Sequence, residues 1–81
     1  MNLFEAKLNS LCKVQSVDIL DGPTKIRLME LGLVIGSNVK VIKKSILKDT
    51  LLIVFNSTCF TLKSNLAREI VVTYAWNFVN W

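Results

Sequence analysis

The fold of this chain is decided by the stretch Arg27-Leu28-Met29-Glu30-Leu31-Gly32-Leu33, which continues into Val34-Ile35-Gly36-Ser37. Pro23 lies shortly before it. Proline suits the first position of a helix, because its missing N–H would be unpaired there and its φ is already helical. Gly32 can adopt the left-handed conformation that ends a helix. The sequence therefore predicts a single short helix of about nine residues.

A helix of this length is not stable alone in water, so packing against the rest of the protein must hold it. Its apolar residues lie on two sides when each position is rotated by about 100°. Leu28 and Leu31 fall on one side, and Ile26, Met29 and Leu33 fall on nearly the opposite side. Two alternatives follow. Either both sides are buried within the protein, or Ile26 and Met29 dock a partner.

The rest of the chain has the pattern of short strands. β-Branched and polar residues mix over Cys12–Ile19 and alternate over Asn38–Lys44, as in half-buried strands. Leu51–Phe55 is apolar throughout, which is typical of a strand covered on both faces. The pair Asn56-Ser57 then predicts a hairpin turn into a strand over Thr58–Lys63.

Five short strands and one short α-helix indicate a mainly β fold, and a small SH3-like barrel is the natural closed arrangement. Ser64 is predicted to cap a single helical turn to Arg68, before a closing strand at Ile70–Val72. We place the domain over residues 1–72 and an aromatic C-terminal extension over residues 73–81. The extension covers the barrel, pairs with a second chain to form a homodimer, or lies at a membrane interface.

Length and composition exclude several classes of protein. The chain has 81 residues, of which 52% are hydrophobic and 20% charged, as expected of one globular domain. Its longest apolar run, Leu51–Phe55, is far shorter than the ~20 residues of a membrane-spanning helix. The N-terminal residues lack the apolar segment of a secretory signal. We therefore expect a cytoplasmic protein without a membrane span.

The sequence lacks the usual components of catalytic and metal sites. There is no histidine, and Cys12 and Cys59 are far apart, so we favour two buried, reduced thiols over a disulfide or a partial metal site, and we expect no metal. The six carboxylates show no paired spacing, and no glycine-rich phosphate loop is present. We expect neither enzymatic activity nor a cofactor.

One basic cluster accompanies the net charge of +4: Lys40, Lys43, Lys44 and Lys48. Such a cluster can be a solvated strand and loop, a surface for an acidic partner, or a nucleic-acid site. Nucleic acid is the least favoured of these, because small barrels usually bind it with aromatic residues interleaved among the basic ones, and none is interleaved here.

Two segments resemble the ferrous iron transport protein A (FeoA) family. The first is the helix and turn over Arg27–Ser37, followed by Val39 and Val41. The second is Phe60–Lys63 followed by Ala67–Val72, which is similar to the last strand, single turn and closing strand of the family. The family usually has proline where this chain has Ile35 and often has glycine in the hairpin turn. Both positions shape turns and carry no chemistry.

The resemblance implies a small cytoplasmic accessory protein of bacterial ferrous iron uptake that binds the membrane GTPase-permease FeoB. Binding and regulation, not catalysis, are what it implies. Two alternatives stay open: a nucleic-acid-binding barrel, and a metal-responsive domain like the SH3-like domain of iron-dependent repressors. The residues that we expect to contact the partner are Ile26, Arg27, Met29, Leu33, Lys43 and Lys44.

Overall fold

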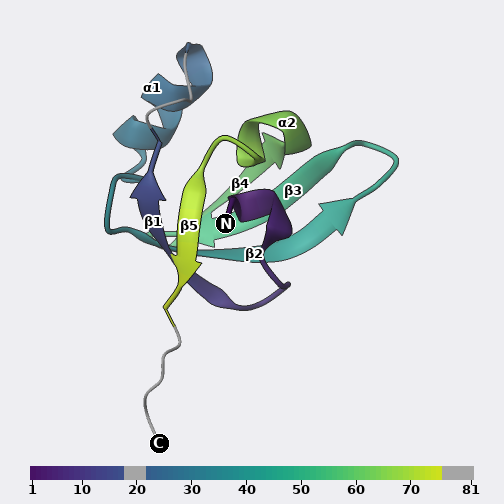
Figure 1. Cartoon of the computed structure of the whole chain (residues 1–81). Coiled ribbons are helices and arrows are strands. Elements are labelled where there is room, and N and C mark those ends of the chain that lie inside the picture. Colours follow the sequence, from purple (N-terminus) through teal and green to yellow (C-terminus); the bar gives the residue numbers. More distant parts are fainter. Residues whose placement is uncertain (18–21, 76–81) are drawn as a thin grey trace, which may run out of the picture.

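The chain forms one antiparallel sheet of five strands that curls over on itself, so that β1 and β5 cross in front of β2, β3 and β4 (Figure 1). The structure is a computed structural model that describes residues 1–17 and 22–75. The order across the sheet is β4-β3-β2-β1-β5. A mainly β barrel of about five strands is confirmed. The strands are β1 (Leu11–Ser16), β2 (Asn38–Ser45), β3 (Thr50–Phe55), β4 (Thr58–Lys63) and β5 (Val71–Tyr74).

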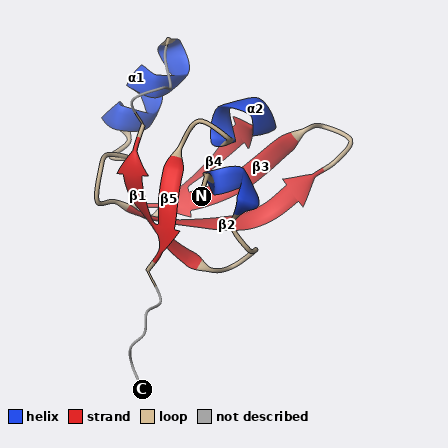
Figure 2. Cartoon of the chain, in the orientation of Figure 1, coloured by secondary structure: helices blue, strands red, loops and turns tan. Residues whose placement is uncertain are grey.

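In the described residues, three helical segments accompany the sheet (Figure 2): η1 (Leu3–Glu5), α1 (Pro23–Glu30) and α2 (Ser64–Ala67). The Asn2 side chain caps η1 by accepting from the N–H of Glu5 at 3.0 Å. Pro23 begins α1, as predicted. Ser64 was predicted to cap α2, and this is wrong: Ser64 is the first helical residue and Lys63 is the cap.

The C-terminus of α1 is closed by a Schellman motif centred on Gly32. Gly32 has a φ of 105°, and its N–H donates to the carbonyl of Met29 at 3.0 Å. The N–H of Leu33 donates to the carbonyl of Leu28 at 2.9 Å. These hydrogen bonds satisfy carbonyls that the end of a helix leaves unpaired. Leu28 and Leu33, brought together by the second bond, are both buried in the core.

This motif corrects the prediction for Leu33. Continued helical rotation would place Leu33 beside Ile26 and Met29, but α1 ends at Glu30. The left-handed Gly32 then turns the chain toward the barrel, and Leu33 is 0% exposed. Leu33 therefore stabilises the core and cannot contact a partner.

The turn between β3 and β4 packs against the end of α1. Asn56 and Ser57 have φ values of 49° and 59°, the left-handed pair of a type I′ hairpin turn, and the predicted hairpin is confirmed. The Asn56 Nδ2 donates to the carbonyl of Leu31 at 3.2 Å. A Cβ added at Gly32 would lie 2.7 Å from that nitrogen. Position 32 thus requires glycine for its backbone conformation and for the space that Asn56 occupies.

A β-bulge in β2 determines which lysine faces outward. The pairing register shifts between Val41 and Lys43, which leaves Ile42 as the extra residue. Strict alternation after Val41 would turn Lys43 toward the core and Lys44 outward. The bulge reverses this arrangement. Lys43 is exposed, whereas Lys44 is half-buried and pairs with the buried Leu51.

The core lies inside the barrel, and β3 contributes only one of its faces to it. Leu51, Ile53 and Phe55 are buried, whereas Leu52 and Val54 on the other face are half-buried. The prediction that β3 is covered on both faces is therefore wrong for the second face. The other core residues are Leu3, Ala6, Cys12, Val14, Val17, Leu28, Leu33, Val39, Val41, Leu62, Ala67, Ile70 and Val72.

The predicted boundary after Val72 falls within β5. That strand continues to Tyr74, and the N–H of Ala75 still donates to the carbonyl of Leu11 at 2.9 Å. The sheet therefore includes the first residues of the predicted extension. Its remaining residues, 76–81, lie outside the described part of the chain, as does Ile19.

Replacing Gly32 with alanine should destabilise the protein more than replacing Gly36 with alanine. Both glycines have a positive φ, which costs an alanine about 1–2 kcal/mol, but only the Cβ at position 32 would meet another group. We expect G32A to lower the free energy of unfolding by a further ~1 kcal/mol, because Asn56 must release its hydrogen bond.

Urea unfolding of G32A, G36A, N56G and the double variant G32A/N56G measures this difference. Asn56→Gly keeps the positive φ of the turn but removes the amide. The double variant should lose only as much free energy of unfolding relative to N56G as G36A loses relative to the wild type. Equal effects of G32A and G36A in the native background would contradict the steric argument.

Candidate functional site

An apolar surface lies on the outer side of α1 and on the turn that follows it. We call it the helix patch, and its residues are Ile26, Met29, Val34 and Ile35, which are 59%, 48%, 45% and 63% exposed. Met29, Val34 and Ile35 also line an open cavity of about 350 Å³, together with Val17 and Lys25. Several clustered aliphatic side chains on one surface are typical of an interaction site, whereas isolated ones are not.

The helix patch contains two of the predicted contact residues, Ile26 and Met29. Arg27 lies between them in the sequence, and its side chain is also exposed. Val34 and Ile35 were missed. They form an aliphatic pair between Gly32 and Gly36, in the same turn as the buried Leu33. The two glycines indicate a turn, but they do not show which of its side chains are exposed.

Lys43 and Lys44, also predicted as contacts, are separate from the helix patch. They lie in the half of β2 that runs away from α1 toward the loop before β3 (Figure 1). The Nζ of Lys44 donates to the carbonyl of Phe4 at 2.7 Å and lies 5.2 Å from the centre of its ring. The Arg68 guanidinium lies 4.1 Å from the same ring centre. Lys44 therefore joins β2 to η1.

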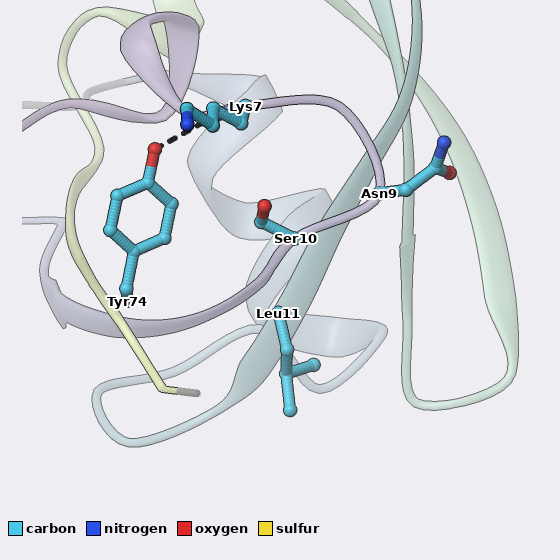
Figure 3. Close-up of a pocket in the computed structure, with 5 residues that line it drawn as sticks. All are labelled: Lys7, Asn9, Ser10, Leu11 and Tyr74. Atoms are coloured by element: carbon cyan, nitrogen blue, oxygen red, sulfur yellow. Dashed lines mark hydrogen bonds between the residues drawn. The ribbon is translucent and has the colours of Figure 1, made fainter. Parts of the chain in front are cut away.

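A second cavity, of about 400 Å³, lies beside β5 (Figure 3). Its lining residues are Lys7, Asn9, Ser10, Leu11 and Tyr74. The backbone N–H of Lys7 donates to the Tyr74 hydroxyl oxygen at 3.1 Å, and the side chains of Asn9 and Leu11 point away from that pair. These polar groups do not converge on one point as catalytic groups do. We assign this cavity to the packing of β5 against the N-terminal segment.

The two cysteines differ in environment. Cys12 is buried in β1, and burial raises the pKa of its thiol. Cys59 is exposed, because it pairs with Val54 on the outer face of the sheet. The prediction of two buried thiols is therefore wrong for Cys59. Over residues 1–17 and 22–75, no three Cys, Asp or Glu side chains gather as metal ligands.

Comparison with known proteins identifies the family. The model of the FeoA domain matches residues 1–74. This chain belongs to the FeoA family. It is 34% identical to the FeoA protein of Chlorobium tepidum, with a TM-score of 0.81 over 93% of this chain and 70% of that one. The family is implicated in ferrous iron transport, and the resemblance read from the sequence is confirmed.

A second FeoA structure supports the fold assignment. The zinc complex of Stenotrophomonas maltophilia FeoA is 34% identical, with a TM-score of 0.73 over 90% of this chain and 89% of that one. It is described as an SH3 domain protein and a candidate activating factor for ferrous iron transport. The SH3-like prediction is thus confirmed. Among the curated proteins, none matches this chain.

The fold also occurs in metal-dependent regulators. A manganese-dependent transcriptional repressor has a TM-score of 0.78 over 91% of this chain and 36% of that one, at 16% identity. At this identity the two share a fold, and nothing more follows for the function of the FeoA chain. Among the described helices, none has the length and apolar character needed to cross a membrane.

Neutralising Lys44 should destabilise the protein, whereas neutralising Lys43 should not. Lys44→Met removes a charged hydrogen bond and a cation–π contact with Phe4, a loss of roughly 1–2 kcal/mol. Lys43→Met changes an exposed side chain and should stay within ~0.5 kcal/mol of the wild type. Urea unfolding of the two variants measures the difference, and equal stabilities would contradict the assigned contact.

The two thiols should react at very different rates in the native protein. The thiolate is the reactive form, and Cys12 is both buried and shifted to a higher pKa, whereas Cys59 is exposed. At pH 8, a disulfide reagent should modify one thiol quickly and the second only on unfolding. Cys59→Ser should abolish the fast phase. A fast phase that survives this substitution would place Cys12 at the surface.

Proposed function

We propose that this chain is a cytoplasmic accessory protein of ferrous iron uptake, and that it binds the cytoplasmic GTPase region of the permease FeoB through the helix patch. Membership of the FeoA family supports the link to ferrous iron transport. The description of the Stenotrophomonas maltophilia protein as a candidate activating factor supports an accessory function. The observation that carries the proposed surface is the exposure of Met29, Val34 and Ile35 around one cavity and of Ile26 one helical turn from Met29.

The helix patch is suited to binding because the fold holds it in place. The Schellman hydrogen bonds and the contact of Asn56 with the Leu31 carbonyl fix the end of α1 relative to the β3–β4 turn. A surface fixed before binding loses little conformational entropy when a partner docks. Met29 adds an adaptable side chain at the edge of the cavity. An aliphatic side chain of the partner can enter that cavity.

Charges of both signs border the helix patch. Lys25 lines the cavity, and Arg27 and Glu30 are exposed on the same helix. A polar rim around an apolar centre is the usual anatomy of a protein interface. The complementary surface on the GTPase region should therefore combine an apolar projection with charged residues of both signs around it.

Polar substitutions in the helix patch should weaken binding to the permease without unfolding the protein. We expect Ile26→Ser and Met29→Ser each to lower the affinity for the isolated GTPase region by about tenfold or more, because apolar anchors dominate interface energies. Titration calorimetry with the GTPase region measures the affinity. Leu8→Ser is a matched control, because Leu8 and Met29 are both 48% exposed and Leu8 lies outside the helix patch.

Two results would contradict the proposal. One is a wild-type chain that binds neither the GTPase region nor the full-length permease at micromolar concentrations. The other is an equal loss of affinity in the Leu8, Ile26 and Met29 variants, which would show that the surface has been misplaced.

A further inference from the structure

The loop between β2 and β3 carries two aliphatic side chains that are almost entirely exposed. Ile46 is 93% exposed and Leu47 is 100% exposed, more than any other large hydrophobic residue in the described part of the chain. We call the loop Ile46–Asp49 the hairpin tip. It lies at the far end of the β2–β3 hairpin, on the opposite side of the molecule from α1 (Figure 1).

The fold does not need these two side chains, because other groups hold the hairpin tip. The N–H of Asp49 donates to the carbonyl of Ile46 at 3.3 Å, and Asp49 takes a left-handed φ of 54°. The carbonyl of Asp49 accepts from the N–H of Ser64 in α2 at 2.9 Å. The N–H of Lys48 donates to the Ser45 hydroxyl at 3.4 Å. Backbone and hydroxyl groups thus fix the loop and leave the aliphatic groups in solvent.

Basic and hydroxyl groups lie in the same hairpin as the two aliphatic side chains. Lys43 and Lys48 line a cavity of about 210 Å³ on the outer face of the sheet, and the other lining residues are Ser45, Thr50, Leu52 and Thr61. Lys63 is also exposed and pairs with Thr50 at the base of the loop. Asp49 is the single carboxylate of the hairpin tip. Two ammonium groups beside hydroxyl donors are suited to a phosphate group.

We propose that the hairpin tip is a membrane-contact site, at which Ile46 and Leu47 insert into the edge of an anionic phospholipid bilayer and the cavity between Lys43 and Lys48 receives a lipid phosphate. Exposed aliphatic groups at the end of a hairpin, with Lys48 in the loop and Lys43 in the adjoining strand, suit a bilayer, where the acyl region lies beneath charged headgroups. Charge complementarity selects an anionic bilayer over a neutral one.

A protein partner fits the hairpin tip less well than a bilayer does. Two aliphatic side chains on a loop of four residues offer a protein little apolar area, whereas the helix patch offers four such side chains and a cavity. Because only one small loop inserts, we expect its adsorption to the bilayer to be weak and reversible. Since α1 lies on the other side of the molecule, the hairpin tip and the helix patch can be occupied at the same time.

Sedimentation with lipid vesicles tests the proposal in the absence of any permease. The full chain should sediment with vesicles of phosphatidylglycerol and phosphatidylethanolamine at low salt, and hardly at all with phosphatidylcholine vesicles. The double variant I46S/L47S should lower the partition coefficient by at least about tenfold, because it removes the two inserted aliphatic groups. K43Q/K48Q should lower it by roughly fivefold for each lysine and reduce its salt dependence.

Ile35→Ser is the matched control, because Ile35 is 63% exposed but belongs to the helix patch. It should leave the vesicle affinity unchanged. Thermal unfolding should show that I46S/L47S is as stable as the wild type, since neither side chain is buried. Failure of vesicle binding would leave the permease proposal intact, because no permease is present.

Three results would overturn the proposal. The first is a wild-type chain that does not bind anionic vesicles even at low salt. The second is binding that K43Q/K48Q weakens but I46S/L47S does not, which would mean electrostatic adsorption without insertion. The third is binding that none of these substitutions changes, which would assign the affinity to another part of the chain.

Discussion

The closure of α1 at Gly32 is the constraint on which the rest of this structure depends. Its left-handed backbone ends the helix, sends Leu33 into the core and leaves Met29 outside. The same residue leaves room for the Asn56 side chain, which ties the β3–β4 turn to the helix. A local backbone requirement thus decides which aliphatic side chains stabilise the barrel and which are left for a partner.

Features set by local backbone chemistry could be predicted from the sequence, and features set by long-range register could not. Pro23 and Gly32 bound the helix, and Asn56-Ser57 makes the hairpin, because proline, glycine and asparagine have specific backbone preferences. Lys44 was misplaced as a contact residue because the bulge at Ile42 exists only once β2 pairs with β3. Sequence periodicity contains no signal for such a shift.

The candidate site was predicted only in part, because sequence patterns are informative within one element and not beyond it. Ile26 and Met29 follow from helical periodicity, which is reliable within one helix. Val34 and Ile35 lie beyond the helix, where the direction of each side chain depends on the turn between Gly32 and Gly36. Cys59 is exposed because it lies on the outer face of the sheet. The sequence of β4 alone does not show whether another layer covers this face.

The position of β5 at the edge of the sheet has a consequence for the order of assembly. β2, β3 and β4 are consecutive in the chain and pair through short turns, so little chain entropy is lost when they meet. The pairing of Cys12 with Tyr74 joins residues near opposite ends of the described chain and closes a much longer loop. From this topology we expect the three-stranded meander to form early in folding and the β1–β5 pairing to form late.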